Sequence, residues 1–346
     1  MRILTVISIC FFNLTSYAQQ DISEKYALTI IEQDLRNLLY VYASDYFEGR
    51  GTGSIGQKRA TDFLRHFYKK NNIQPAKGTV DFFQEFNMSI SGKRGVQTRL
   101  TLDKKGNVKS ENVIAIIEGS EKPEEYIIIS AHLDAIGYVN GKIHNGADDD
   151  GSGTVALLEI AEAFNKAKLD GHGPKRSIVF LHVSGEENGL RGSEFYTKNP
   201  VYELSKTNVN LNVDMIGRID PTRIDKNPNY IYLIGSNRLS LDLHDVSEIV
   251  NAKTTNLLLD YKFNDPKDPN RFYERSDHYN FAKNNIPVIF YFSGTHEDYH
   301  KPSDTAEKII YSLLAKRTKL IFHTAWELAN RENRISPNIK QKILIN

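Results

Sequence analysis

The strongest constraint on the fold is an apolar, β-branched run, Tyr126–Ser130, that stops abruptly at polar side chains. Such a run is typical of a parallel strand that is buried on both faces of a sheet. His132 and Asp134 follow it directly. Because open α/β sheets bind ligands just beyond the carboxyl ends of their strands, the sequence predicts that these two side chains lie at a ligand crevice.

The residues at this strand end are of the types that hold a metal ion. His132 supplies an imidazole, which suits zinc, and Asp134 is placed to accept a hydrogen bond from the second ring nitrogen and fix its tautomer. Farther on, Asp148, Asp149 and Asp150 crowd three like charges together, which costs free energy unless a cation or solvent relieves them. A solvated, Asp-rich turn before a helix is the alternative interpretation, and this stretch alone does not separate the two.

The same pattern, a strand followed by charged residues, recurs along the chain. Residues 176–187 predict a buried strand followed by Glu186 and Glu187, and residues 208–217 predict a third strand that ends in Asp214. Three strands are therefore expected to deliver acidic or imidazole groups to one edge of a sheet.

Strands and helices alternate along the rest of the chain. Residues 80–119 alternate in the manner of antiparallel edge strands. Apolar periodicity predicts two further strands and five helices, the strands at 230–236 and 286–294 and the helices at 57–71, 154–168, 239–252, 277–284 and about 306–330. No repeat or linker interrupts the pattern, so residues 19–346 are expected to form one domain. We expect an α/β fold, a three-layer α/β/α sandwich around a mostly parallel, mixed central sheet.

The N-terminus is typical of a secretory signal peptide. Arg2 precedes the apolar segment Ile3–Leu14, and small residues lead to an expected cleavage after Ala18, which makes residues 1–18 the signal. The segment is too short to span a bilayer, so we expect an exported protein, periplasmic or secreted, without stable membrane insertion. A buried first strand is the alternative. The single cysteine, Cys10, lies in this segment, and the bulky Ile9 before it argues against a lipid anchor.

The charge of the chain argues against a nucleic-acid partner. Lysine and arginine number 44 and aspartate and glutamate 43, and the resulting formal net charge is +1. The basic residues are scattered rather than gathered in blocks, so the sequence lacks the electrostatic footprint of a nucleic-acid-binding protein.

Five short motifs occur in a fixed order between roughly residues 110 and 310. They are AHLD, GADDDGSG, SGEE, NVDMIG and YHKPSDT. With this set the chain resembles the co-catalytic dizinc aminopeptidases of the secreted bacterial leucyl aminopeptidase type, whose relatives include glutamate carboxypeptidase and glutaminyl cyclase. The resemblance implies a zinc exopeptidase-like fold and a metallopeptidase activity.

The resemblance also implies a set of metal ligands. Carried over by position, it makes His132 and Asp214 ligands of one zinc ion and Glu187 and His300 ligands of a second, with Asp149 bridging the two. Two co-catalytic Zn²⁺ ions are thus the expected cofactors. A ligand set of nitrogen and oxygen without cysteine suits a hydrolytic site.

Three more residues take catalytic roles by the same resemblance. Glu186 corresponds to the general base that accepts a proton from the attacking water, and Asp134 to the carboxylate that orients His132. Tyr273 matches a tyrosine that stabilises the tetrahedral oxyanion. In those enzymes the neighbourhood of this tyrosine can contain a disulfide, whereas this chain has no cysteine there.

The expected activity is hydrolysis of the N-terminal peptide bond of peptides that carry a free N-terminus. A carboxypeptidase or dipeptidase of the same superfamily is the alternative, although the sequence shows no arginine cluster for a substrate carboxylate. A glutaminyl cyclase is disfavoured because such enzymes use a single zinc ion, and a non-catalytic binding protein is disfavoured because all five ligand positions are intact.

Overall fold

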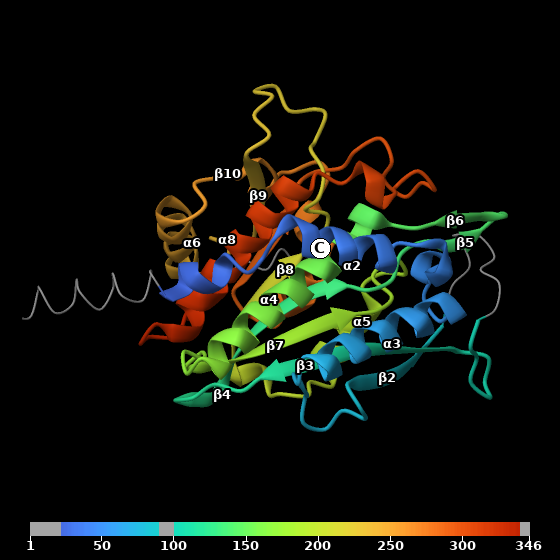
Figure 1. Ribbon diagram of the computed structural model, residues 1–346, viewed down its shortest axis with the longest axis horizontal. Helices are drawn as coiled ribbons and strands as arrows, with labels where there is room; N and C mark the ends of the chain where they lie inside the picture. The colour runs from blue at the N-terminus through green and yellow to red at the C-terminus, as the bar shows by residue number, and fades with distance from the viewer. Residues whose placement is uncertain (1–21, 90–99, 340–346) are drawn as a thin grey trace, which may run out of the picture.

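The computed structural model of the chain describes residues 22–89 and 100–339 (Figure 1). The expected signal peptide, residues 1–18, and Cys10 lie outside the described residues. Within the described ranges, no helix is both long enough and apolar enough to cross a membrane.

Nine strands of the described chain form one sheet, in the order β1-β3-β7-β4-β8-β11-β9-β10, with β2 pairing to β3. The strands are β1 (Gln74–Pro75), β2 (Phe83–Met88), β3 (Val108–Ile117), β4 (Lys122–His132), β7 (Arg176–Val183), β8 (Thr207–Val213), β9 (Tyr230–Ile234), β10 (Leu258–Asp260) and β11 (Val288–Phe292). A separate hairpin consists of β5 (Gly137–Val139) and β6 (Lys142–His144).

The centre of the sheet is parallel. Strand β7 pairs with β4, β4 with β8, and β8 with β11, all in parallel. The flanks contain the antiparallel pairs, because β1, β2 and β7 all run antiparallel to β3, and β9 runs antiparallel to β11. The mixed sheet is confirmed, and so are the antiparallel strands expected within residues 80–119.

Helices cover both faces of the sheet, as the three-layer sandwich requires (Figure 1). Successive side chains of β4 point to opposite faces, so Ile127 and Ile129 join one apolar core while Ile128 joins the other. The first core contains residues of α2 (Glu32–Tyr42), α3 (Ile55–Lys70), α4 (Gly153–Leu169), α6 (Leu241–Lys253) and α8 (Tyr311–Asn330). The second contains residues of α5 (Arg191–Lys198) and α7 (His278–Ala282).

The last helix begins later than the periodicity predicts. A short 3-10 turn, Ala306–Lys308, is separated from α8 by Ile309 and Ile310, and the backbone of Ile309 is extended. The next amide, that of Ile310, donates to the carbonyl of Gly217 instead of continuing a helix. A tertiary hydrogen bond therefore interrupts a segment that is helical by pattern.

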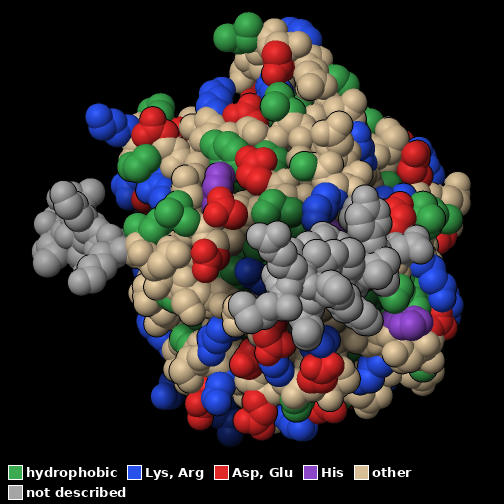
Figure 2. All heavy atoms as spheres, turned by 90° about the vertical axis from the view of Figure 1, so that its left-hand side faces the viewer, with side chains coloured by type: hydrophobic (Ala, Val, Ile, Leu, Met, Phe, Trp, Pro, Cys, Tyr) green, Lys and Arg blue, Asp and Glu red, His purple; other side chains and the backbone are tan. Residues whose placement is uncertain are grey.

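Charges of both signs are interspersed on the face shown in Figure 2, where acidic and basic side chains alternate with apolar ones. No single-sign patch dominates this view. The arrangement on this face agrees with the near balance of 44 basic and 43 acidic residues.

His182 is a packed core residue, as its position in the middle of an apolar strand indicates. Its side chain projects from β7 toward α3, where Nε2 lies 2.7 Å from the hydroxyl of Tyr68, and both residues are fully buried. Burial lowers the pKa of His182 to about 3, because the charged imidazolium would lose its hydration.

The stability of the protein should therefore depend on His182 in mildly acidic solution. The unfolded chain binds a proton at this residue below about pH 6.5, whereas the folded chain resists protonation down to about pH 3, so the free energy of unfolding should fall as the pH decreases across this window. The slope from one such group is at most about 1.4 kcal/mol per pH unit.

His182→Gln should show a shallower decrease between pH 6.5 and 4, even though its stability at pH 7 is lower. Chemical denaturation of both proteins at several pH values measures the two slopes. Metal ligands are common to both proteins, so their proton uptake cancels in the comparison. Equal slopes would contradict the assignment.

Candidate metal centre

The residues predicted to bind metal lie at the carboxyl ends of the parallel strands. His132 is the last residue of β4, Glu187 follows β7, Asp214 follows β8 and His300 follows β11. Asp149 comes from the turn η2 (Ala147–Ser152), which leads into α4. Register brings the strand ends together, because His132 of β4 pairs with Val183 of β7 and Ser130 of β4 with Asn212 of β8.

These side chains form two groups that share one member. In the first, Nε2 of His132 lies 3.1 Å from Oδ1 of Asp149 and 3.6 Å from Oδ1 of Asp214. In the second, Nε2 of His300 lies 3.1 Å from Oδ2 of Asp149 and 3.2 Å from Oε2 of Glu187. The ligand atoms of each group lie within 4.8 Å of one another. Asp149 therefore presents one carboxylate oxygen to each group.

The donor set fits zinc. It consists of imidazole nitrogens and carboxylate oxygens at short range, and the three carboxylates of Asp149, Glu187 and Asp214 are all buried. Buried like charges at such distances need a cation close by. The pKa of Asp149 lies below its ordinary value, because the charges and hydrogen bonds of His132 and His300 outweigh the opposing effect of burial. The shared carboxylate is thus held in the anionic form that a metal requires.

Glu186 lies beside this pair of groups and lines the same cavity as Asp149 and Asp214. Burial raises its pKa well above the ordinary value, and the neighbouring Glu187 carboxylate raises it further. A raised pKa suits a carboxylate that must accept and release a proton.

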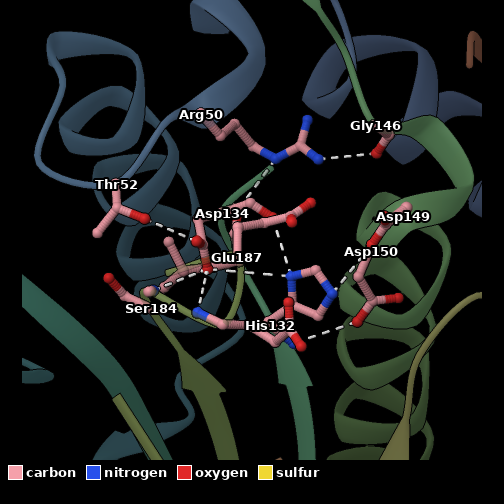
Figure 3. Close-up of polar contacts among 12 residues, drawn as sticks. Arg50, Thr52, His132, Asp134, Gly146, Asp149, Asp150, Ser184 and Glu187 are labelled. Atoms are coloured by element: carbon pink, nitrogen blue, oxygen red, sulfur yellow. Dashed lines mark hydrogen bonds and ion pairs between the residues drawn. The ribbon is translucent and has the colours of Figure 1, made fainter. Parts of the chain in front are cut away.

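Asp134 orients His132, but not through the group that the sequence suggests. Nδ1–H of His132 donates to the backbone carbonyl of Asp134 at 3.0 Å, while the nearest carboxylate oxygen of Asp134 is 3.9 Å from Nδ1. The carboxylate instead accepts hydrogen bonds from the hydroxyl of Thr52 at 2.7 Å and from the amides of Gly185 and Glu186 at 2.9 and 3.3 Å (Figure 3). Asp134 thereby couples His132 to the turn that carries Glu186.

Asp150 joins three segments of the site. One carboxylate oxygen accepts from the amides of Gly153, at the start of α4, and of Met215, after β8, at 2.9 and 3.2 Å. The other accepts from the amide of His132 at 3.1 Å. Asp150 therefore ties the end of β4 to the start of α4 and to the segment after β8.

Asp304 supports the shared carboxylate and was not singled out from the sequence. Its carboxylate accepts from the amides of Asp148 and Asp149, each at 3.1 Å. Asp148 in turn lies 3.2 Å from Nε2 of His296, and His144 donates to the backbone carbonyl of His300 at 3.1 Å. The position of Asp304 inside the YHKPSDT motif was the available signal.

Tyr273 lines a surface groove and not the cavity that contains Asp149, Glu186 and Asp214. It packs under the guanidinium of Arg238, 4.6 Å from the ring centre, and borders a surface groove with Asp265. The neighbouring Phe272 faces the cavity beside the metal groups instead. Both residues belong to one short 3-10 turn, Phe272–Glu274, in which successive side chains point in different directions.

Tyr299, in contrast, lines the cavity that contains Asp149, Glu186 and Asp214. Its ring stacks on that of His300 at a centroid distance of 3.7 Å. Its hydroxyl accepts a hydrogen bond from Arg275 at 3.3 Å. The remaining lining residues include Asp149, Glu186, Asp214, Met215, Phe272, Phe290, Phe292 and Thr295. Adjacency to His300 in the sequence was the signal for this tyrosine.

Comparison with known proteins supports the metal-binding interpretation. A family model described as Peptidase family M28 matches residues 112–325. The chain is 40% identical over 107 residues to a probable glutamate carboxypeptidase LAMP1 of Arabidopsis thaliana, which covers 31% of this chain and 15% of that protein. It is 28% identical over 232 residues to the probable aminopeptidase YDR415C of Saccharomyces cerevisiae, which covers 64% of this chain and 58% of that protein. The chain thus spans only part of the length of these relatives.

Solved structures share the fold at low sequence identity. The aminopeptidase from Aneurinibacillus sp. strain AM-1 matches with a TM-score of 0.65 and 16% identity, covering 92% of this chain and 98% of that one. BSAP, a zinc aminopeptidase from Bacillus subtilis, matches with a TM-score of 0.63 and 16% identity, covering 90% and 99%. Bacterial aminopeptidases, one of them described as a zinc enzyme, therefore have the same α/β architecture.

The shared position of Asp149 leads to a prediction about metal content. Asp149→Asn should weaken binding in both groups, because each loses an anionic oxygen, whereas Asp214→Asn should weaken binding in the first group alone. Metal analysis after dialysis against limiting zinc gives the stoichiometry. Asp245→Asn, a change at an exposed position of α6, is the control and should match the wild type. Full retention of metal by Asp149→Asn would contradict the bridging role.

Proposed function

Because the chain belongs to peptidase family M28, we propose that it is an exported dizinc aminopeptidase that hydrolyses the N-terminal peptide bond of peptides. The observation that carries the proposal is the carboxylate of Asp149, whose two oxygens face His132 and His300 at equal distances of 3.1 Å. The predicted signal peptide supports export to the periplasm or the medium.

The ligand roles follow the two groups. His132 and Asp214 would hold one zinc ion, Glu187 and His300 the other, and Asp149 both. Bound zinc supplies a Lewis acid for the scissile carbonyl and lowers the pKa of an attacking water from about 15.7 towards about 7. The side chains of the protein supply the remaining steps.

Glu186 is the general base in this proposal. Its carboxylate lines the cavity beside Asp149 and Asp214, so it can accept the proton of the attacking water and pass it to the leaving amine. The amide of Glu186 donates to Asp134, which fixes the turn that bears it. Asp134 therefore helps to position both the base, Glu186, and the ligand His132.

Tyr299 takes the role that the sequence suggested for Tyr273. Its side chain lines the cavity, and because its hydroxyl accepts a hydrogen bond from Arg275, the hydroxyl hydrogen is available to the oxyanion that develops on the substrate. The phenyl rings of Phe272, Phe290 and Phe292 line the rest of the cavity and offer an apolar surface to the side chain of the N-terminal residue.

A carboxypeptidase or dipeptidase is the second candidate, and one observation favours it. Arg275 lies on the rim of the cavity, and within residues 22–89 and 100–339 no carboxylate is found in ion-pair contact with it. A guanidinium in this position could bind the carboxylate of a short substrate. The cavity is lined by three carboxylates, those of Asp149, Glu186 and Asp214, and by one arginine. Carboxylates would stabilise a free α-amine, so the aminopeptidase remains the better-supported function.

The first test concerns the free α-amine. A peptide with a free N-terminus should be shortened from that end, and its N-acetylated twin should resist, because the amide has no positive charge to interact with the buried carboxylates. Mass spectrometry of the products identifies the end that is cleaved. Trimming from the C-terminus, or equal turnover of the blocked peptide, would favour the carboxypeptidase.

The second test separates the two adjacent glutamates. Glu186→Gln should keep its zinc yet lose turnover by about 10²–10⁴-fold, because an amide is nearly isosteric but cannot accept the proton. Glu187→Gln should instead bind zinc more weakly, because a dication loses an anionic ligand, and its activity should partly recover as zinc is raised.

Zinc titration of both variants, with rates measured at each concentration, distinguishes these outcomes. The two variants act as controls for each other, since they make the same chemical change at neighbouring positions. Recovery of Glu186→Gln with added zinc, or tight zinc binding by Glu187→Gln, would show that base and ligand have been assigned wrongly.

A further inference from the structure

Arg50 is a buried cation beside the metal centre to which neither the sequence motifs nor the proposed reaction assigns a role. Its side chain is fully buried, and its guanidinium lies 4.6 Å from the ring centre of Tyr42. Four hydrogen bonds connect it to backbone carbonyls, of which Figure 3 shows the one to Gly146, and no carboxylate of the described residues accepts from it. Removing a cation from water costs several kcal/mol unless its donors are satisfied, so this arrangement has a strong energetic reason to stay intact.

The acceptors of Arg50 belong to the two segments that carry metal ligands. Nε donates at 3.0 Å to the carbonyl of Leu133, the residue directly after His132. Nη1 and Nη2 donate at 2.6 and 2.8 Å to the carbonyls of Asn145 and Gly146, which immediately precede the turn with Asp149. A fourth bond, from Nη1 to the carbonyl of Tyr42 at 3.3 Å, ties the guanidinium to α2.

The guanidinium of Arg50 thus links the two ends of the loop that connects His132 to Asp149. The β5–β6 hairpin lies within this loop, between Leu133 and Asn145. Arg50 donates to the carbonyls of both of these residues. Gly146 allows this close approach, because its φ is +53° and a Cβ there would lie 2.1 Å from the carbonyl oxygen of Asp149 and 3.2 Å from Nη2 of Arg50. Few side chains other than arginine can donate to separate carbonyls in one plane.

We propose that Arg50 is a positioning residue for the zinc centre, which sets the distance between His132 and Asp149 and thereby the affinity for zinc. The inference rests on the proposed dizinc function. Arg50 acts on one side of the His132 backbone, through the carbonyl of Leu133, while Asp150 holds the other side by accepting from the amide of His132. Because both contacts hold the segment that bears His132, this segment has little freedom to compensate for the loss of either one.

The test compares Arg50→Lys with a matched control, Arg176→Lys. Arg176 is also almost fully buried and donates to the carbonyls of Leu328, Arg331 and Glu332, although its Nε in addition pairs with the carboxylate of Glu125 at 2.6 Å. It lies at the start of β7, at the opposite end of that strand from Glu187. Lysine keeps the charge at both positions and removes the planar set of donors. Any general effect of disturbing a buried arginine should therefore appear equally in both variants.

The measured quantity is zinc affinity, obtained by competition with a chromophoric chelator on the full mature chain. Arg50→Lys should bind zinc at least about tenfold more weakly than the wild type, the range typical when groups that orient metal ligands are removed. Arg176→Lys should keep the wild-type affinity. Thermal unfolding of the metal-free proteins shows whether both variants remain folded.

The outcomes separate the inference from the proposed function. A wild-type chain that binds fewer than two zinc ions would count against the dizinc proposal itself. If the wild type binds two, then unchanged affinity in Arg50→Lys, or an equal loss in both lysine variants, would overturn the role of Arg50.

Tyr42→Phe provides a second route if Arg50→Lys does not fold. This change removes the hydroxyl that donates to the same Leu133 carbonyl at 2.9 Å and keeps the ring beneath the guanidinium. Weaker zinc binding by the folded Tyr42→Phe protein would support control of affinity through the Leu133 carbonyl, and wild-type affinity would contradict it.

Discussion

The carboxylate of Asp149 connects the two halves of the metal centre, and the surrounding structure is arranged to hold it. Its two oxygens each lie 3.1 Å from a histidine nitrogen, one from the end of β4 and one from the loop after β11. Four buried or half-buried carboxylates gather within this small volume, an arrangement that a folded protein tolerates only with cations or strong donors close by. The parallel centre of the sheet makes the gathering possible, because β7, β4, β8 and β11 all end at one edge.

Hydrogen bonds between backbone groups and buried charged side chains hold several of the ligand segments in place. The amides of Asp148 and Asp149 donate to Asp304, the amide of His132 donates to Asp150, and its imidazole donates to a backbone carbonyl. On the opposite side, Arg50 contributes donors to carbonyls. Buried charges of either sign are thus satisfied by peptide dipoles, which have fixed directions and leave the candidate metal ligands free to bind an ion.

Much of the fold and the ligand set could be predicted from the order of residues along the chain. The run before His132 indicates a buried strand, and the motifs that follow later strands indicate which side chains reach the same edge, since parallel strands end together. The side on which Phe272 and Tyr273 face could not be predicted, because both lie in a single 3-10 turn whose orientation depends on packing against β9 and β11. Asp304 and Arg50 act through backbone contacts with residues distant in sequence, which no local pattern reveals.

The sequence by itself determined the chemistry of the site: which residue types meet at the strand ends, that their donors are nitrogen and oxygen, and that a carboxylate, Glu186, stands beside a ligand. The tertiary structure alone decided which atom performs each task. It assigned the support of His132 to the carbonyl of Asp134 and the aromatic position beside His300 to Tyr299. Residue identity is a local property, whereas the direction of a side chain in a loop depends on rotations of a few backbone bonds, and these are set by contacts that form only when the sheet edge is assembled.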